Sequence, residues 1–259
     1  STCLGLRTPL LAALEVLQER HARARALGRK GGRCGTTSSV WRAPMTCAEL
    51  RDAELLGWGA EDLTADDMAT LGLILPWMPS LKRLYLSSNT FAGAGVQALC
   101  ERLGRGAAPS LRNLDLSYNK IGLAGAEALA AALRRGAMPK LVVLELGDNI
   151  IGNQGVAALA PALKKLPALE ILDLGVCGIG DDGVSSLVDN LGKNDFKKLE
   201  IMYLENNLLT DKGCAKLVAA LKAGGLPAIE ALYRVHPGHP DDPEEEDELS
   251  EAAVLSKLA

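Results

Sequence analysis

The chain has 259 residues, of which 48% are apolar and only 3% aromatic, and its formal net charge is −4. No apolar run approaches the roughly 18 residues that a membrane-spanning helix needs. Basic residues are not interleaved with aromatic ones, as they would be in a nucleic-acid-binding protein. These features argue against a membrane span and against a nucleic-acid partner.

A basic segment begins the chain, with eight Arg and Lys residues but only two Glu within residues 1–42. A helix is predicted to begin at Pro9 and end at Gly28, and the glycine-rich stretch 29–39 is predicted to be a mobile loop. We expect residues 1–45 to cap the fold. A targeting remnant and a basic contact arm are the alternatives.

Residues 46–80 are predicted to form a degenerate first copy of a unit that recurs further along the chain. Leucines at helical spacing run from Leu63 to Leu75. The strand half of this copy, near Leu50 to Leu55, lacks the regular pattern. We place Trp58 and Gly59 in an enlarged turn that follows it.

Residues 81–228 contain five regular copies of one pattern. Their first leucines stand 28 to 30 residues apart, at Leu81, Leu111, Leu141, Leu169 and Leu199. A period in this range is typical of a solenoid, in which each unit buries its apolar face against its neighbours.

Each copy combines two periodicities. In the first copy, Leu84 and Leu86 alternate with polar residues, which predicts a short strand. Gly95, Leu99 and Leu103 then recur four apart, which predicts a helix. The glycine at the start of that spacing is predicted to let the helix approach the sheet closely.

A turn position between strand and helix is polar in four of the five copies. Asparagine side chains there can satisfy backbone groups left bare at the strand end, so we predict a structural role rather than ligand binding. The position is occupied by Asn89, Asn119, Asn149, Cys177 and Asn207.

Residues 229–259 are predicted to form an atypical terminal repeat with an acidic capping helix. The strand is recognisable near Ile229 and Leu232, and eight acidic residues lie within residues 241–251. Asp242 and Pro243 suit a helix start. An acidic lure for a basic partner is the alternative role of this segment.

Six cysteines are present and none belongs to a CxxC motif: Cys3, Cys34, Cys47, Cys100, Cys177 and Cys214. A structural zinc site is therefore not expected, and the cysteines are predicted to be reduced apolar fillers. This favours a reducing, intracellular compartment, cytoplasmic by default. The sequence leaves a plastid or a flagellum open.

The repeated LxxLxLxxN pattern resembles that of leucine-rich repeat proteins of the ribonuclease-inhibitor type, which have long, helix-containing repeats. The resemblance covers residues 81–228 and continues with departures on both sides. It implies an α/β solenoid shaped as a horseshoe arc, with a parallel sheet on the concave face and helices on the convex face. It also implies that the concave face binds another protein.

The residues at the centre of each predicted strand face the concavity, and three neighbouring ones are carboxylates. They are Tyr85, Asp115, Glu145, Asp173, Tyr203 and Tyr233. Like charges on adjacent strands cost stability and do nothing for folding, so we predict that this row binds a basic segment of a partner protein. Further members of the predicted face are Arg83, Tyr118, Asp148 and Glu205. Solvated strand positions and a metal site are the alternatives.

Catalysis finds little support in the sequence. The three histidines, His21, His236 and His239, are remote from any nucleophile motif, and no phosphate-binding loop of the GxxxxGK[ST] type is present. We expect no cofactor and no enzyme activity. The prediction is an interaction scaffold or a structural subunit of a larger assembly. A regulator similar to a GTPase-activating protein for a small GTPase and a fragment of an innate-immune type sensor are the alternatives.

Overall fold

The computed structural model describes residue 19 and residues 22–30, 33–36, 39–42, 46–233 and 248–250, with side chains for residues 19, 22–30 and 46–232. The basic segment 1–18 and most of the acidic segment 234–259 lie outside the described residues. Within the described part, no helix is both long and apolar enough to cross a membrane.

Seven parallel strands form the centre of one sheet, and every pair of neighbours is in register. The strands are β3 (Leu55–Gly57), β4 (Arg83–Tyr85), β5 (Asn113–Asp115), β6 (Val143–Glu145), β7 (Ile171–Asp173), β8 (Ile201–Tyr203) and β9 (Ala231–Tyr233). Each strand has three residues, and its central residue is buried in the core.

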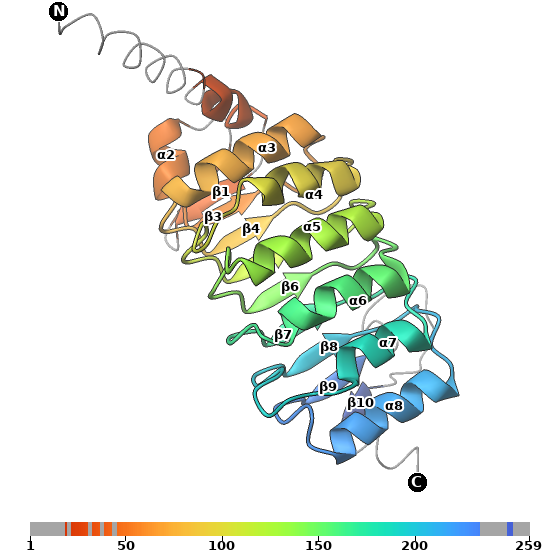
Figure 1. Ribbon diagram of the computed structural model, residues 1–259. Coiled ribbons are helices and arrows are strands. Elements are labelled where there is room, and N and C mark those ends of the chain that lie inside the picture. The colour runs from red at the N-terminus through yellow and green to blue at the C-terminus, as the bar shows by residue number, and fades with distance from the viewer. Residues whose placement is uncertain are drawn as a thin grey trace, which may run out of the picture.

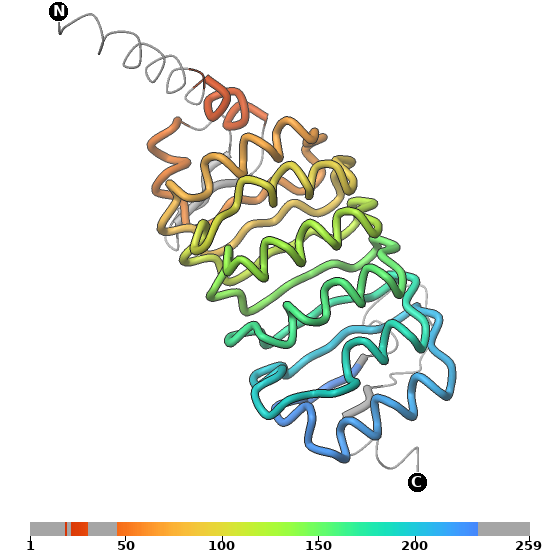
Figure 2. Tube along the Cα trace, in the orientation of Figure 1, coloured from red at the N-terminus to blue at the C-terminus, as the bar shows by residue number. Residues whose placement is uncertain are grey.

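A helix follows each strand up to β8, and the helices form a second layer beside the sheet (Figure 1). They are α3 (Ala65–Ile74), α4 (Ala92–Glu101), α5 (Gly122–Arg134), α6 (Gly152–Leu163), α7 (Asp181–Val188) and α8 (Asp211–Lys222), with the short helix η1 (Leu75–Trp77) after α3. Strands lie about 4.8 Å apart whereas packed helices need 8–10 Å, so the array curves with the sheet on its inner side. The predicted α/β solenoid is confirmed, and Figure 2 shows its regular path.

One continuous apolar core lies between the two layers and runs the length of the array. The glycines that begin the four-residue spacing in each regular helix, such as Gly125, are buried beside it, but the prediction that they let the helix approach the sheet is wrong. A Cβ at Gly125 would overlap the Ile121 side chain and would lie 3.1 Å from the Cα of Gly93 in α4. The missing side chain therefore lets α5 pack against its own first turn and against the neighbouring helix.

The first unit is more regular than the sequence suggests. Leu50 lies in helix α2 (Cys47–Asp52) rather than in a strand, and β3 begins at Leu55. Trp58 does not lie in an enlarged turn. It is fully buried and occupies the slot that Leu86 fills in the next unit, because Gly57 pairs with Tyr85.

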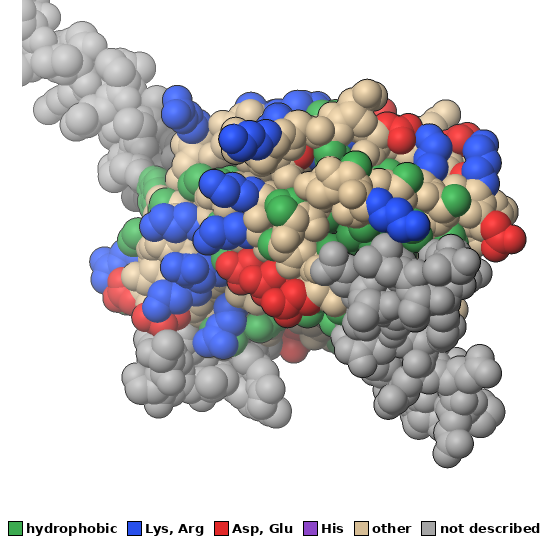
Figure 3. All heavy atoms as spheres, turned by 90° about the horizontal axis from the view of Figure 1, so that it is seen from below, with side chains coloured by type: hydrophobic (Ala, Val, Ile, Leu, Met, Phe, Trp, Pro, Cys, Tyr) green, Lys and Arg blue, Asp and Glu red, His purple; other side chains and the backbone are tan. Residues whose placement is uncertain are grey.

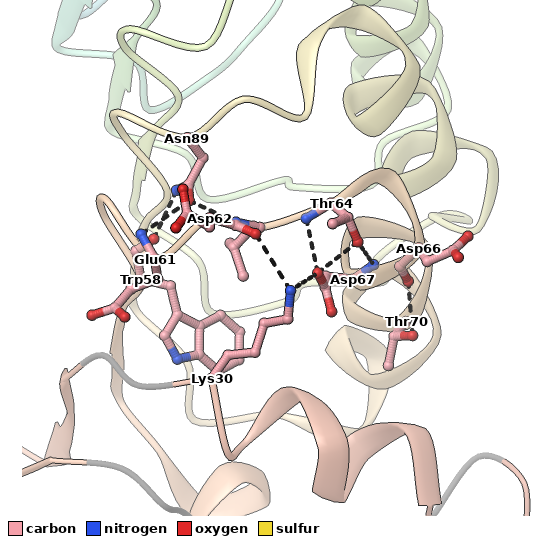
Figure 4. A network of polar contacts seen from close by, with 10 residues as sticks. Lys30, Trp58, Glu61, Asp62, Thr64, Asp66, Asp67, Thr70 and Asn89 are labelled. Carbon is pink, nitrogen blue, oxygen red and sulfur yellow. Dashed lines mark hydrogen bonds and ion pairs between the residues drawn. The ribbon is translucent and has the colours of Figure 1, made fainter.

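The N-terminal segment is fixed to this first unit by apolar packing and by the polar contacts of Lys30. Residues 22–27 are helical, and Leu27 is buried in the common core. Lys30 Nζ lies 2.7 Å from Asp67 Oδ2 and donates to the Asp62 carbonyl oxygen at 3.3 Å. Asp67 also forms a capping box with Thr64 at the start of α3 (Figure 4).

Antiparallel strands close both ends of the parallel sheet. Strands β1 (Arg33–Thr36) and β2 (Ser39–Arg42) form a hairpin, and β1 pairs with β3, so the predicted loop over residues 29–39 is wrong where these strands lie. Strand β10 (Glu248–Ser250) pairs with β9. The predicted acidic helix is therefore wrong at these three residues, and the remainder of it lies outside the described residues.

Candidate functional site

The strand residues that point away from the core form one continuous surface, here called the strand face. Its central row is set by the register of the sheet: Tyr85 pairs with Asp115, Asp115 with Glu145, Glu145 with Asp173, and Asp173 with Tyr203. All five residues are half-buried. Three carboxylates therefore stand side by side on adjacent strands, as the sequence predicts.

The two aspartates of this row also have a local structural role. Asp115 Oδ1 accepts a hydrogen bond from the Ser117 backbone N–H at 2.9 Å, and Asp173 Oδ1 accepts one from Gly175 at 2.8 Å. Each carboxylate thus satisfies a backbone donor where the chain leaves its strand. This role uses one oxygen of each carboxylate.

Glu145, between the two aspartates, has an unusual protonation equilibrium. Burial, together with the negative charges of Asp115 and Asp173, raises its pKa to about 7. Both effects disfavour the charged form. The centre of the acidic row therefore changes charge near neutral pH.

This shift predicts a dependence of stability on pH. A carboxyl whose folded pKa exceeds its unfolded pKa favours folding when it is protonated, below about pH 4.5, and loses that contribution as the pH rises through 7. The melting temperature should therefore fall between about pH 5 and pH 7.5, and Glu145→Gln should flatten this part of the curve. Differential scanning calorimetry of both proteins checks this. Equal slopes for the two would contradict it.

Glu205 does not belong to the exposed part of the strand face, contrary to the prediction. Its side chain is only 3% exposed, and it lies across the position of Gly175. A Cβ at Gly175 would be 2.7 Å from Glu205 Cδ, so the glycine provides the space for this carboxylate. The alternation of strand residues did not reveal this, because Glu205 follows the end of β8.

The other predicted members of the face lie at its edges. Arg83 begins β4 and is half-buried, and its neighbour Lys82 pairs with Glu54 at 3.2 Å. Tyr118 lies in the turn after β5 and is 60% exposed. A hydrogen bond to the Asp148 carboxylate raises the pKa of the Tyr118 hydroxyl. The side chain of Tyr233 lies outside the described residues.

Charge is separated on the molecular surface. Figure 3 shows a compact group of acidic side chains at the centre of one face, with basic side chains gathered to its left. Such a separation orients a charged partner as it approaches.

The turn asparagines form a hydrogen-bonded ladder across the units. Asn119 Nδ2 donates to the carbonyls of Leu86, Leu116 and Ser117, each at 2.9 Å, while its Oδ1 accepts from the Asn89 backbone N–H at 2.9 Å. Asn89, Asn149 and Asn207 repeat these contacts in their own units. These side chains therefore hold adjacent turns together.

Cys177 interrupts the ladder. Its Sγ donates to the Leu146 carbonyl at 3.2 Å, which is the contact to the preceding unit that an asparagine amide makes in the other turns. Its backbone N–H still donates to Asn207 Oδ1 at 3.0 Å. The turn that contains Cys177 therefore keeps its hydrogen bond to Asn207, but Cys177 itself provides fewer hydrogen bonds to the preceding turn than an asparagine would.

Cys177→Asn is expected to stabilise the protein. The new amide would donate to the Leu146 carbonyl and would offer an oxygen to the backbone N–H groups of Asn149 and Ile151, as in the other turns. We expect a gain of about 1–2 kcal/mol in the free energy of unfolding, measured by urea denaturation. Cys177→Ser, whose hydroxyl cannot reach both neighbours, is the control. An unchanged midpoint for the asparagine variant would show that the turn has no room for the ladder.

The described residues give no sign of metal or thiol chemistry. No group of three or more His, Cys, Asp and Glu side chains among them could hold a metal ion. Cys100 and Cys177 are free and buried, and burial raises the pKa of each thiol to about 12. These thiols stay protonated at neutral pH and are poor nucleophiles.

The structure shows two surface features that the sequence analysis did not predict as a whole, although Tyr118 belongs to the second. A hollow of about 350 Å³ lies between α4 and α5, beside Gln97, Glu127 and Arg135. Arg135 uses its guanidinium to bind the carbonyls of Cys100 and Leu103 at the end of α4, which is a structural role. The second feature is a set of exposed apolar side chains in the turns, Tyr118, Ile150 and Leu208.

Comparison with known proteins gives one result for the repeats. A family model described as a leucine-rich repeat matches residues 78–100, 107–130, 137–160 and 165–188. The fifth unit, β8 and α8, continues the same register and the same ladder without being matched. No curated protein matches the chain.

Proposed function

We propose that this leucine-rich repeat chain is a non-enzymatic scaffold or structural subunit that binds a basic segment of another protein through its strand face. Leucine-rich repeats suggest a protein-protein interaction module. The observation that supports the finer proposal is the row Asp115, Glu145 and Asp173, in register on adjacent strands. A cation from a partner would relieve the repulsion within this row.

The row has dimensions that suit a peptide. Adjacent strands lie about 4.8 Å apart, so the outer carboxylates are separated by roughly 10 Å. Two lysines or arginines two turns apart on a helix, or three residues apart on an extended chain, span about 10 Å. Tyr85 and Tyr203 flank the row and would provide aromatic contacts at its two ends.

The proposal is tested with synthetic peptides and the full chain. A fluorescent peptide of lysine and serine should bind the wild-type protein, and binding should weaken as salt rises. The combined variant Asp115→Asn, Glu145→Gln, Asp173→Asn should weaken binding about tenfold or more, because it removes the charge but keeps the shape. A glutamate and serine peptide should not bind.

A matched control changes the same number of charges on the helix layer. Glu101→Gln, Glu127→Gln and Asp182→Asn together lie on α4, α5 and α7, away from the strand face. Equal weakening by both triple variants would show that only net charge matters, which would sink the proposal. Acceleration of GTP hydrolysis by a small GTPase on addition of the chain would instead favour the regulatory alternative.

A further inference from the structure

Large exposed apolar side chains gather in the turns that connect the strands to the helices. Tyr118, Ile150 and Leu208 are 60%, 75% and 71% exposed, and they lie in the turns after β5, β6 and β8. We call these three residues, together with Gly178 between Ile150 and Leu208, the rim patch. Apolar groups collected in this way mark an interaction surface more often than a lone exposed side chain does.

The backbone at two of these positions makes the choice of residue unusual. Tyr118 has a φ of 56° and Ile150 a φ of 42°, in the left-handed region that disfavours bulky and especially β-branched residues. Other units use the same left-handed positions: Ser88, Asp148, Val176 and Asn206 correspond to Tyr118, and Lys120 and Gly178 correspond to Ile150. Since polar residues or glycine hold most of these positions, the turn itself does not require a large apolar side chain at Tyr118 or Ile150.

The patch has a gap at its centre. A Cβ at Gly178 would meet one atom only, Ile150 Cγ2 at 3.5 Å, so the space above this glycine is open. Leu208 lies in the next turn, where its backbone N–H donates to the Ile179 carbonyl at 2.7 Å. An apolar side chain of a partner could lie over Gly178, between the side chains of Ile150 and Leu208.

The surroundings of the gap are acidic. Asp148 accepts a hydrogen bond from Tyr118 and belongs to the same turn as Ile150. The carboxylate row of Asp115, Glu145 and Asp173 begins at the strand ends beneath these turns. A partner that places an apolar side chain over Gly178 would therefore bring its neighbouring residues against negative charge.

From this combination we propose that the rim patch and the carboxylate row form one surface for a basic amphipathic segment of a partner protein. An apolar side chain of that segment lies over Gly178, and its lysines or arginines face Asp148 and the row. This inference rests on the proposed function, because it extends the same site. Under this inference, the charges of the carboxylate row provide only part of the affinity for the partner segment, and apolar contact with the rim patch provides the rest.

The test compares two peptides of equal charge on the full chain. A peptide of lysine and leucine, with leucines on one helical face, should bind about tenfold more tightly than the lysine and serine peptide. Ile150→Asn and Leu208→Asn should each abolish most of that advantage. Gly178→Asn should do the same by filling the gap. Trp77→Asn removes an apolar residue that is 54% exposed and lies outside the patch, and it should have no effect.

A stability measurement separates a binding role from a structural one. Asparagine tolerates the left-handed backbone, so Ile150→Asn should keep or raise the melting temperature while it weakens binding. A lowered melting temperature together with unchanged peptide binding would assign Ile150 to the fold and overturn the inference.

The remaining outcomes distinguish the two proposals. If the two lysine peptides bind equally and only the carboxylate variant weakens them, the proposed function holds and the rim inference fails. If no lysine peptide binds, both fail. The chain is also tested for self-association and for binding to anionic lipid vesicles. If Ile150→Asn abolishes either one and the peptides do not compete with it, the rim patch belongs to a second copy or to a membrane surface. Either result would overturn the inference.

Discussion

Leu116→Asp is expected to abolish the cooperative unfolding transition of the protein. Leu116 is fully buried at the end of β5 and belongs to the core that all units share. An aspartate there would place a carboxyl among apolar side chains with no partner, which costs several kcal/mol. That cost is comparable to the whole stability of a typical domain, about 5–15 kcal/mol.

The position in the array increases the effect. Each unit of a solenoid is stabilised by its two neighbours, so loss of a central unit also removes support from the units on both sides. Circular dichroism should show reduced helix content and a broad melt. Lys120→Asp adds a carboxylate to the exposed turn of the same unit and should melt like the wild type. A sharp melt of Leu116→Asp near the wild-type temperature would contradict the expectation.

Asn119→Ala is expected to cause the largest loss of stability among the polar substitutions. The change removes three donated hydrogen bonds, to Leu86, Leu116 and Ser117, and the acceptor for the Asn89 N–H. Asn119 is fully buried, so water cannot replace these contacts. Leaving several buried backbone groups without partners should cost roughly 3–5 kcal/mol.

Urea denaturation and thermal melting both measure this effect. For a protein of this size the melting temperature should fall by about 10 °C or more. Asn194→Ala, at an exposed position, is the matched control and should change the free energy of unfolding by less than about 0.5 kcal/mol. A loss for Asn119→Ala no greater than that of the control would show that the ladder does not stabilise the fold.

The central part of the fold was predictable because it depends on local spacing. The alternation at Leu84 and Leu86 reflects the geometry of a strand, and the four-residue spacing of Gly95, Leu99 and Leu103 reflects that of a helix. Five copies of the same pattern make both predictions stronger. The core position of Trp58 was not predicted, because a tryptophan stands where the other units have leucine. Only its pairing with the next strand shows that it fills the same slot.

The ends of the sheet were not predictable for a different reason. Strands β1 and β10 contain glycine or charged residues and form through pairing with strands that are distant in sequence. Composition therefore suggested a loop and a helix. Pairing across the edge of a sheet outweighs such local preferences.

The sequence predicted which carboxylates lie next to one another in the candidate site, but not how buried or exposed the residues around them are. The register places Asp115, Glu145 and Asp173 together because the repeat length is nearly constant. The burial of Glu205 depends on Gly175 in the preceding unit, and the exposure of Ile150 depends on a turn whose backbone is left-handed. Neither property follows from the position of a residue within its own repeat.

The antiparallel strands at both ends give the strand face a fixed length. The outer edge of β3 is taken by β1 and that of β9 by β10, so neither end offers the parallel edge from which another repeat would continue. Seven parallel strands at about 4.8 Å extend for roughly 29 Å. The length of the strand face therefore limits the distance between contact points that its parallel strands can span.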